Sequence, residues 1–107
     1  MEKWDNRKTR DLIEILLALK SEKEAKMFLR DLMTEKELLE FGNRWKAAQM
    51  LSEKASYPEI QKETGLSSRT IARISKWLKK GKCGYKLMLN RINHHAGSSR
   101  KRSVMTG

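Results

Sequence analysis

Hydrophobic residues recur at intervals of three and four along most of this chain, which is the spacing of one face of an α-helix. Alternation with a period of two, which would indicate a strand, never continues for more than a few residues. The pattern therefore predicts an all-α protein of about six helices. We expect them over residues 6–20, from residue 21 onward, and over 34–53, 57–64, 67–80 and 85–93.

Three of the expected helix starts carry a capping box. In this motif a Ser or Thr hydroxyl accepts a hydrogen bond from a free backbone N–H, and a Glu three residues later reaches back to the cap. The pairs are Ser21 with Glu24, Thr34 with Glu37, and Ser56 with Glu59. Inside the third helix, Gly42 costs up to about 1 kcal/mol relative to alanine. We therefore expect another backbone to pack closely against Gly42.

The two helices over 57–64 and 67–80 have the spacing of a helix-turn-helix. Gly65 stands where the turn needs a left-handed backbone. Apolar residues stand where the two helices must pack on each other and on the core: Ile60, Leu66, Ile71 and Ile74. Gln61 departs from the usual pattern, in which a small residue holds this position. An ordinary pair of packed helices is the alternative, and the outer face of the second helix favours the helix-turn-helix.

The charge of the chain is strongly uneven. The net charge is +11, from 24 Lys and Arg against 13 Asp and Glu. Acidic and basic residues balance as far as residue 63, and no acid follows Glu63. The excess predicts a polyanionic partner. Part of it lies in residues 96–107, which are small, polar and basic, and which we expect to form a disordered tail after a single domain over 1–95.

A basic helix with short polar groups in its first turn can enter the major groove of DNA. Arg69 can pair with guanine through two hydrogen bonds, worth about 1–3 kcal/mol of discrimination, and Thr70 can contact a thymine methyl. Residues of the first helix are expected to position the phosphate backbone. The candidate DNA-contacting residues are Tyr57, Gln61, Lys62, Ser67, Ser68, Arg69, Thr70, Arg73, Lys76 and Lys80. Lys79 and Lys82 add attraction for phosphate.

The sequence offers no catalytic arrangement, so we expect no enzyme, no cofactor and no metal site. It has no phosphate-binding glycine loop and no Ser/His/Asp set. Its single cysteine, Cys83, excludes an internal disulfide, and the adjacent His94 and His95 cannot share one helix face. Cys83 is either an inert residue or a regulatory thiol. No apolar run reaches the roughly 20 residues that span a bilayer, and we expect a cytoplasmic protein without a signal peptide or membrane contact.

Three segments carry a resemblance to a known family: MTEKE at 33–37, GNRWKAA at 42–48, and SYPEIQKETGLSSRTIARISKWL at 56–78. Together with the order of the helices, the stretch 28–89 resembles the Trp repressor superfamily, and it is most similar to the YerC/YecD branch of Trp repressor-like proteins. The resemblance implies an intertwined homodimer with one reading head per chain. It also implies a cytoplasmic bacterial transcription regulator acting on an operator of two-fold symmetry. A chain of this length buries only about two thirds of its unfolded surface, so a second subunit would also help stability.

The resemblance further implies an effector pocket. Two arginines that sandwich an indole in the tryptophan-responsive repressor correspond to Arg44 and Arg73, and a threonine corresponds to Thr34. Where that repressor has glycine and serine, this chain has Ile74 and Trp77. We hypothesise that free tryptophan is not a corepressor here and that Trp77 partly fills the space. Trp77 as an ordinary core residue is the alternative, and whether another small molecule binds stays open.

These observations predict a sequence-specific DNA-binding transcriptional regulator, and a repressor in particular. Two alternatives remain. One is a basic helical adaptor that binds an acidic protein or RNA and has no operator. The other is the DNA-binding accessory of a replication or transposition system. Preference for one duplex sequence over random duplex separates a repressor from an adaptor.

Overall fold

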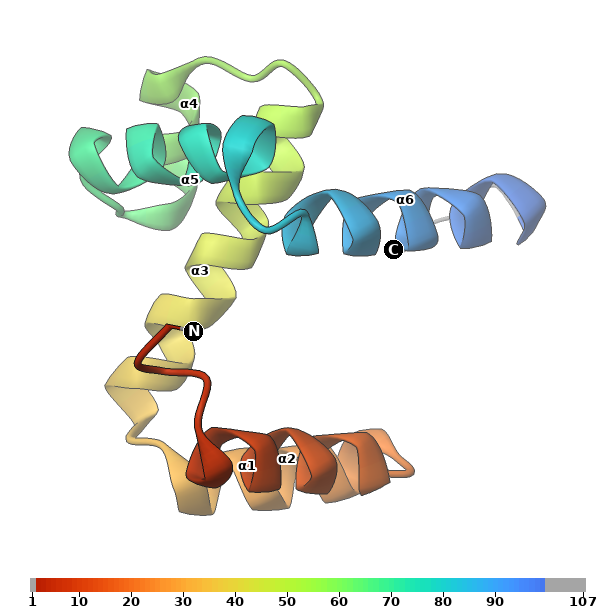
Figure 1. Ribbon diagram of the computed structural model, residues 1–107. Coiled ribbons are helices and arrows are strands. Elements are labelled where there is room, and N and C mark those ends of the chain that lie inside the picture. The colour runs from red at the N-terminus through yellow and green to blue at the C-terminus, as the bar shows by residue number, and fades with distance from the viewer. Residues whose placement is uncertain (1, 100–107) are drawn as a thin grey trace. The chain divides into compact units, whose positions relative to one another are not determined.

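The computed structural model describes residues 2–99, and it describes their side chains as far as residue 93. In this part of the chain all regular structure is helical, which confirms the all-α prediction (Figure 1). The six helices are α1 (Arg7–Ala18), α2 (Glu22–Leu32), α3 (Glu35–Ser52), α4 (Tyr57–Thr64), α5 (Ser68–Lys80) and α6 (Gly84–Ser99). None of these helices is both long and apolar enough to cross a membrane.

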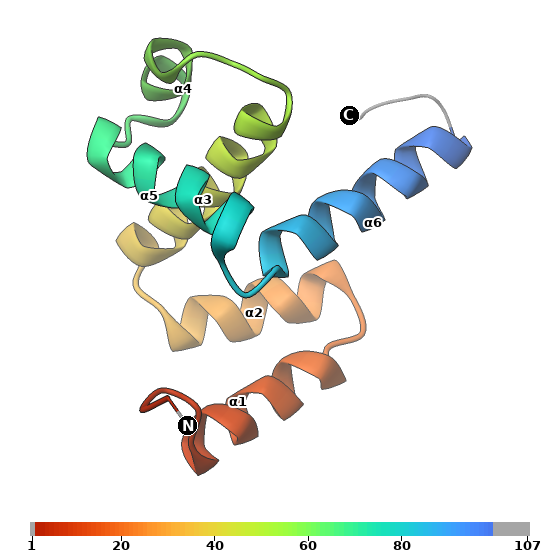
Figure 2. The same cartoon turned by 45° about the horizontal axis from the view of Figure 1, so that its top comes forward.

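The chain divides into two compact units, Met1–Leu39 and Glu40–Gly107. The single domain expected over residues 1–95 stays a prediction. The boundary falls inside α3, so no break in helical spacing marks it. The first unit contains α1 and α2. The second unit contains the rest of α3 and the helices that follow, and in it α4 and α5 lie against each other in both views (Figure 2).

The helix starts agree with their predicted caps, with one difference in detail. Ser56 and Glu59 form a complete capping box at α4. At α3 the backbone N–H of Glu37 donates to Thr34 Oγ1, and Glu37 accepts from the backbone N–H of Thr34. At α2 the Ser21 hydroxyl accepts from the N–H of Glu24, but the Glu24 carboxylate accepts from the N–H of Lys20 instead of Ser21. The predicted box at Ser21 is therefore only half formed.

The ends of the helices are where the prediction departs most. The first helix ends at Ala18, and α6 continues to Ser99 past its predicted end at residue 93. The helix thus takes in residues 96–99 of the tail expected to be disordered, because extending a formed helix adds a hydrogen bond for each residue fixed. Residues 100–107, with the rest of that expected tail, lie outside the described residues.

The core of the molecule lies in the second unit. Six of its buried residues form one hydrophobic cluster: Ala47, Ala48, Ile60, Leu66, Ile71 and Ile74. The two alanines of α3 have no exposed surface, and their small side chains allow α4 and α5 to pack closely on that helix. All four apolar residues predicted to pack the helix-turn-helix belong to this cluster. At Gly42 the expected close approach is absent, since no other element of the described chain lies within 4 Å of the position a Cβ would take.

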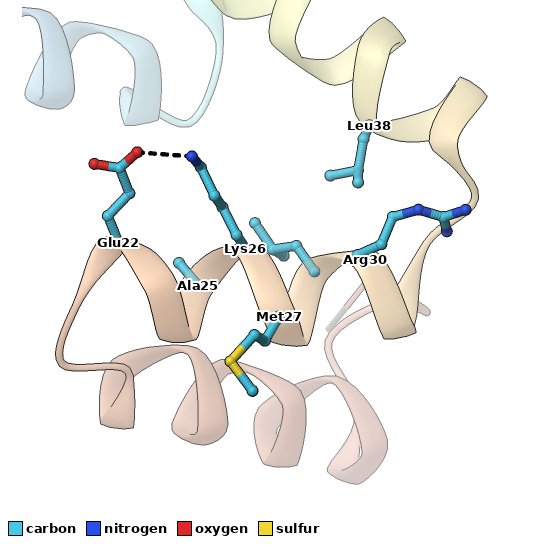
Figure 3. Close-up of a pocket in the computed structure, with 7 residues that line it drawn as sticks. Glu22, Ala25, Lys26, Met27, Arg30 and Leu38 are labelled. Atoms are coloured by element: carbon cyan, nitrogen blue, oxygen red, sulfur yellow. Dashed lines mark ion pairs between the residues drawn. The ribbon is translucent and has the colours of Figure 1, made fainter.

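In the first unit, neither α1 nor α2 contains a buried residue. Leu17 is 81% exposed and Met27 is 60% exposed. A cavity of about 510 Å³ lies along one side of α2, lined chiefly by Ala25, Leu29 and Leu38, with the Glu22–Lys26 ion pair (3.1 Å) at its edge (Figure 3). The apolar faces of this unit are therefore largely open to solvent.

Candidate nucleic-acid interface

The turn between α4 and α5 is held by local hydrogen bonds. Gly65 has φ +74°, and its N–H donates to the carbonyl of Gln61 at 2.8 Å. The Thr64 hydroxyl donates to the carbonyl of Ile60 at 2.7 Å and accepts from the N–H of Leu66 at 3.2 Å. Thr64 is the buried polar residue of this segment, and its side chain is satisfied on both sides. The angle between the two helices is thus fixed by the backbone and by a residue that the sequence pattern did not single out.

The first turn of α5 is capped by its own side chains. The N–H of Thr70 donates to Ser67 Oγ at 3.2 Å, and the two hydroxyls lie 3.1 Å apart. Thr70 is half-buried, whereas Ser67, Ser68 and Arg69 are exposed. The start of α5 therefore presents two short polar groups and one arginine to solvent.

Four cations lie along one face of α5: Arg69, Arg73, Lys76 and Lys80. We call them the basic stripe. Spacings of four, three and four residues confine them to an arc of about 60° on a helix that turns about 100° per residue. All four are exposed, and α5 contains no acid. Ion pairs between residues four apart lie instead on α1, α2 and α3.

The remaining candidates come from α4 and from the loop after it. Tyr57, Gln61, Lys62 and Ser67 are exposed, and Tyr57 exposes 37% of its surface. Of the ten residues predicted to contact DNA, only Thr70 is partly shielded. All ten belong to α4, α5 or the loop that joins them.

The residues of the expected effector pocket have different surroundings. Ile74 is fully buried in the core, and Arg73 belongs to the basic stripe. Trp77 is 40% exposed and is therefore not one of the buried core residues of the chain. Arg44 is half-buried, pairs with Glu40 at 2.9 Å, and lies over the Phe41 ring at 5.6 Å.

The Nε atom of Arg44 has no hydrogen-bond partner in the described structure, although it is buried. Thr34 lies in the first unit, where it caps α3.

Arg44 also influences Tyr85, a residue that the sequence analysis did not single out. Tyr85 of α6 stacks on Trp45 of α3, with ring centroids 6.4 Å apart and planes 16° from parallel. Burial raises the pKa of Tyr85, and the positive charge of Arg44 offsets part of that rise. The stack fixes the start of α6 on α3, and only the fold brings the two rings together.

No group of three or more His, Cys, Asp or Glu side chains is placed to hold a metal ion within the described side chains. Cys83 is exposed and has φ +72°. The side chains of His94 and His95 lie outside the part that is described.

Comparison with known proteins agrees with this geometry. A family model described as Trp repressor protein matches residues 7–93. The chain is 33% identical over 92 residues to the uncharacterized protein YerC of Bacillus subtilis (strain 168), which covers 86% of this chain and 88% of that protein.

Two solved structures have the same fold. A TrpR-like protein from Eubacterium eligens ATCC 27750 superposes with a TM-score of 0.81 at 33% identity, covering 85% of this chain and 94% of that one. A proposed Trp repressor from Staphylococcus aureus gives a TM-score of 0.79 at 27% identity, covering 87% and 96%. The resemblance noted in the sequence is thus confirmed, and the chain belongs to the Trp repressor protein family.

Proposed function

We propose that this protein is a sequence-specific DNA-binding regulator of transcription, and a repressor, that acts in the bacterial cytoplasm. The observation that carries the proposal is the basic stripe. Four exposed cations follow one face of the second helix of a helix-turn-helix, with no acid on that helix. A regulator of this kind needs no catalytic group, which agrees with family membership.

In the proposed complex, α5 lies in the major groove. Arg69 stands in its first turn, where the recognition helix of a helix-turn-helix contacts base edges. Arg73, Lys76 and Lys80 follow along the same face and contact phosphates or bases further along the groove. Tyr57, Gln61 and Lys62 of α4 lie against the phosphate backbone, where they set position but carry no sequence information.

We further propose that the protein reads DNA as a homodimer. The open apolar faces of α1 and α2 support this, because a second copy would cover surface that the chain leaves exposed. Two-fold symmetry would place the two recognition helices about 34 Å apart, one turn of DNA, and would require an operator of matching symmetry.

Selection from a pool of random duplexes tests both proposals. We expect enriched sites with two-fold symmetry that bind at least about 10³-fold more tightly than random duplex. Arg69→Ala should lower affinity for the selected site by about 1–3 kcal/mol and relax the preference at one base pair of each half-site. Arg7→Ala, which removes an exposed arginine of α1 paired with Asp11, is the control. Equal binding of selected and random duplexes would favour the adaptor alternative instead.

The same protein is proposed to act without free tryptophan. Ile74 is committed to the core, and Trp77 lies three residues further along the same helix, so a tryptophan-shaped ligand would compete with side chains of the chain itself. Calorimetry with L-tryptophan should give no binding at micromolar concentration and no change in operator affinity. Micromolar binding coupled to tighter operator binding would contradict the proposal, and Trp77→Ser would show whether the indole is the obstacle.

A further inference from the structure

A second cavity, of about 470 Å³, lies in the unit that contains the helix-turn-helix. Its walls come from the end of α3, the C-terminal half of α5 and the middle of α6. Its volume falls within the range of about 300–1,000 Å³ that is usual for small-molecule sites. None of the residues of the basic stripe lines it, so a ligand here would leave that surface free.

Each of the three elements contributes one leucine to the lining. They are Leu51 of α3, Leu78 of α5 and Leu89 of α6. Leu89 is 7% exposed, and the other two are half-buried. These side chains form an apolar surface that several elements share, which is how ligand pockets are usually built.

The charged part of the lining is of one sign. Lys54, Lys79 and Lys86 line the cavity, and no acidic residue does. None of the three takes part in an ion pair among the described side chains. Positive charges around an apolar surface attract an anion, and no carboxylate of the lining competes with that anion for the lysines.

Lys54 stands at a position that glycine would occupy at lower cost. Its φ is +69°. It closes α3, since its N–H donates to the carbonyl of Leu51 and the N–H of Ala55 donates to the carbonyl of Met50, each at 3.0 Å. This pair of bonds defines a helix C-terminus at which glycine is the usual residue. A left-handed lysine costs about 1–2 kcal/mol, and here the lysine brings its side chain to the cavity.

We propose that this cavity binds a small organic anion with an apolar body, of the class of aliphatic monocarboxylates. The leucines cover the hydrocarbon part, and the lysines neutralise the carboxylate. The ligand would contact α5 through Leu78 and Lys79, on a side of that helix away from the basic stripe.

Hexanoate is the probe, and its neutral isostere hexanamide is the matched comparison. Titration of the full chain, followed by the backbone amide signals in two-dimensional NMR, should give saturable shifts at residues 51–54, 75–79 and 86–90 with hexanoate. Hexanamide and inorganic phosphate should bind at least about tenfold more weakly, because each lacks either the charge or the hydrocarbon.

Two variants separate a lost ligand contact from a lost fold. Lys86→Gln should weaken hexanoate about two- to fivefold, as expected for one partly exposed ion pair. Lys54→Gly should weaken it similarly while raising the Tm of the unliganded protein, because glycine relieves the left-handed backbone. Lys46→Gln, an exposed lysine of α3 outside the cavity, should change neither affinity nor these shifts.

The proposal fails if hexanamide binds as well as hexanoate or if the shifts follow the basic stripe instead of the cavity. It also fails if no saturable shift occurs. Amide signals of the cavity that change with protein concentration, and not with hexanoate, would likewise overturn it by showing that a second copy covers this surface.

Discussion

At the scale of single residues, two glycines show that the backbone conformation determines how an added side chain changes the stability of the fold. At both Gly42 and Gly65, no other part of the described chain lies within 4 Å of the position a Cβ would take. Gly42 lies inside α3, whereas Gly65 has φ +74° at the end of α4. Since space is available at both positions, only the conformation distinguishes them.

Replacing each glycine by alanine should therefore shift stability in opposite directions. Gly42→Ala should raise the free energy of unfolding by about 0.5–1 kcal/mol, because alanine loses less entropy in a helix. Gly65→Ala should lower it by about 1–2 kcal/mol, the cost of a left-handed non-glycine residue. Urea denaturation measures both changes. A loss of stability in Gly42→Ala would mean that another backbone packs on that residue, as one from a second copy would.

The residues that the sequence predicted well are those whose structure is decided locally. The caps at Thr34 and Ser56 depend on contacts three residues apart, so spacing alone identifies them. The exposure of Trp77 and the burial of Arg44 Nε depend on which helices meet, and a helical period does not specify that. Lys54 gave no signal either, because its importance arises from a cavity that three separate elements share.

At the scale of the element, α4 is a short helix that owes its start to one carboxylate. Glu59 Oε1 accepts from the N–H of Ser56 at 2.9 Å and from its hydroxyl at 3.0 Å. These bonds favour the charged form, so the hydrogen bond from the Ser56 backbone, and then that from its side chain, lower the pKa of Glu59 below 4.5. Glu37 is held in the same way at the start of α3, where its hydrogen bonds with Thr34 lower its pKa.

The capping box makes the stability of the helix-turn-helix depend on acidity. Because the pKa of Glu59 is lower in the folded chain, the carboxylate stabilises the fold above its unfolded pKa. That contribution is lost as pH falls below about 4.5 and through the lower folded pKa. Glu59→Gln should therefore show a smaller loss of unfolding free energy between about pH 5 and pH 3 than the unmodified protein, as measured by urea denaturation at each pH.

Glu63→Gln on the same helix controls for the loss of one negative charge. A pH profile of Glu59→Gln that is as steep as that of the unmodified protein would show that the box contributes nothing to folding.

Helix ends were predicted less well than helix starts at this scale, and α6 is the clearest example. No glycine or proline occurs between residues 85 and 96, and the continuation of α6 to Ser99 depends on the cooperativity of the helix itself.

At the scale of the whole molecule, charge and core coincide in one unit. The buried cluster and the basic stripe both lie in the unit Glu40–Gly107, and no acid follows Glu63. Binding to a polyanion requires positive charges that no acidic residue neutralises, held in place by a packed core. This arrangement was foreseeable from the charge count and the turn glycine.

DNA binding through this unit should depend steeply on salt. The logarithm of the binding constant should fall with the logarithm of salt concentration with a slope of about −0.9 for each phosphate neutralised. Lys76→Gln and Lys80→Gln should each make the slope shallower by about 1. Lys46→Gln, away from the stripe, should leave it unchanged. Slopes that are the same in all four proteins would place the phosphate contacts on another surface.

The first two helices contain no buried residue, and helices of this length have little persistence in water without a surface to cover them. If an identical subunit supplies that surface, α1 and α2 become fully structured only when two chains associate. The rate of this step then rises with the square of the chain concentration. At low expression, most chains would then be partly folded monomers that proteases degrade. At high expression, most chains would be folded dimers. The gene's output would thereby acquire a threshold, set by chain abundance.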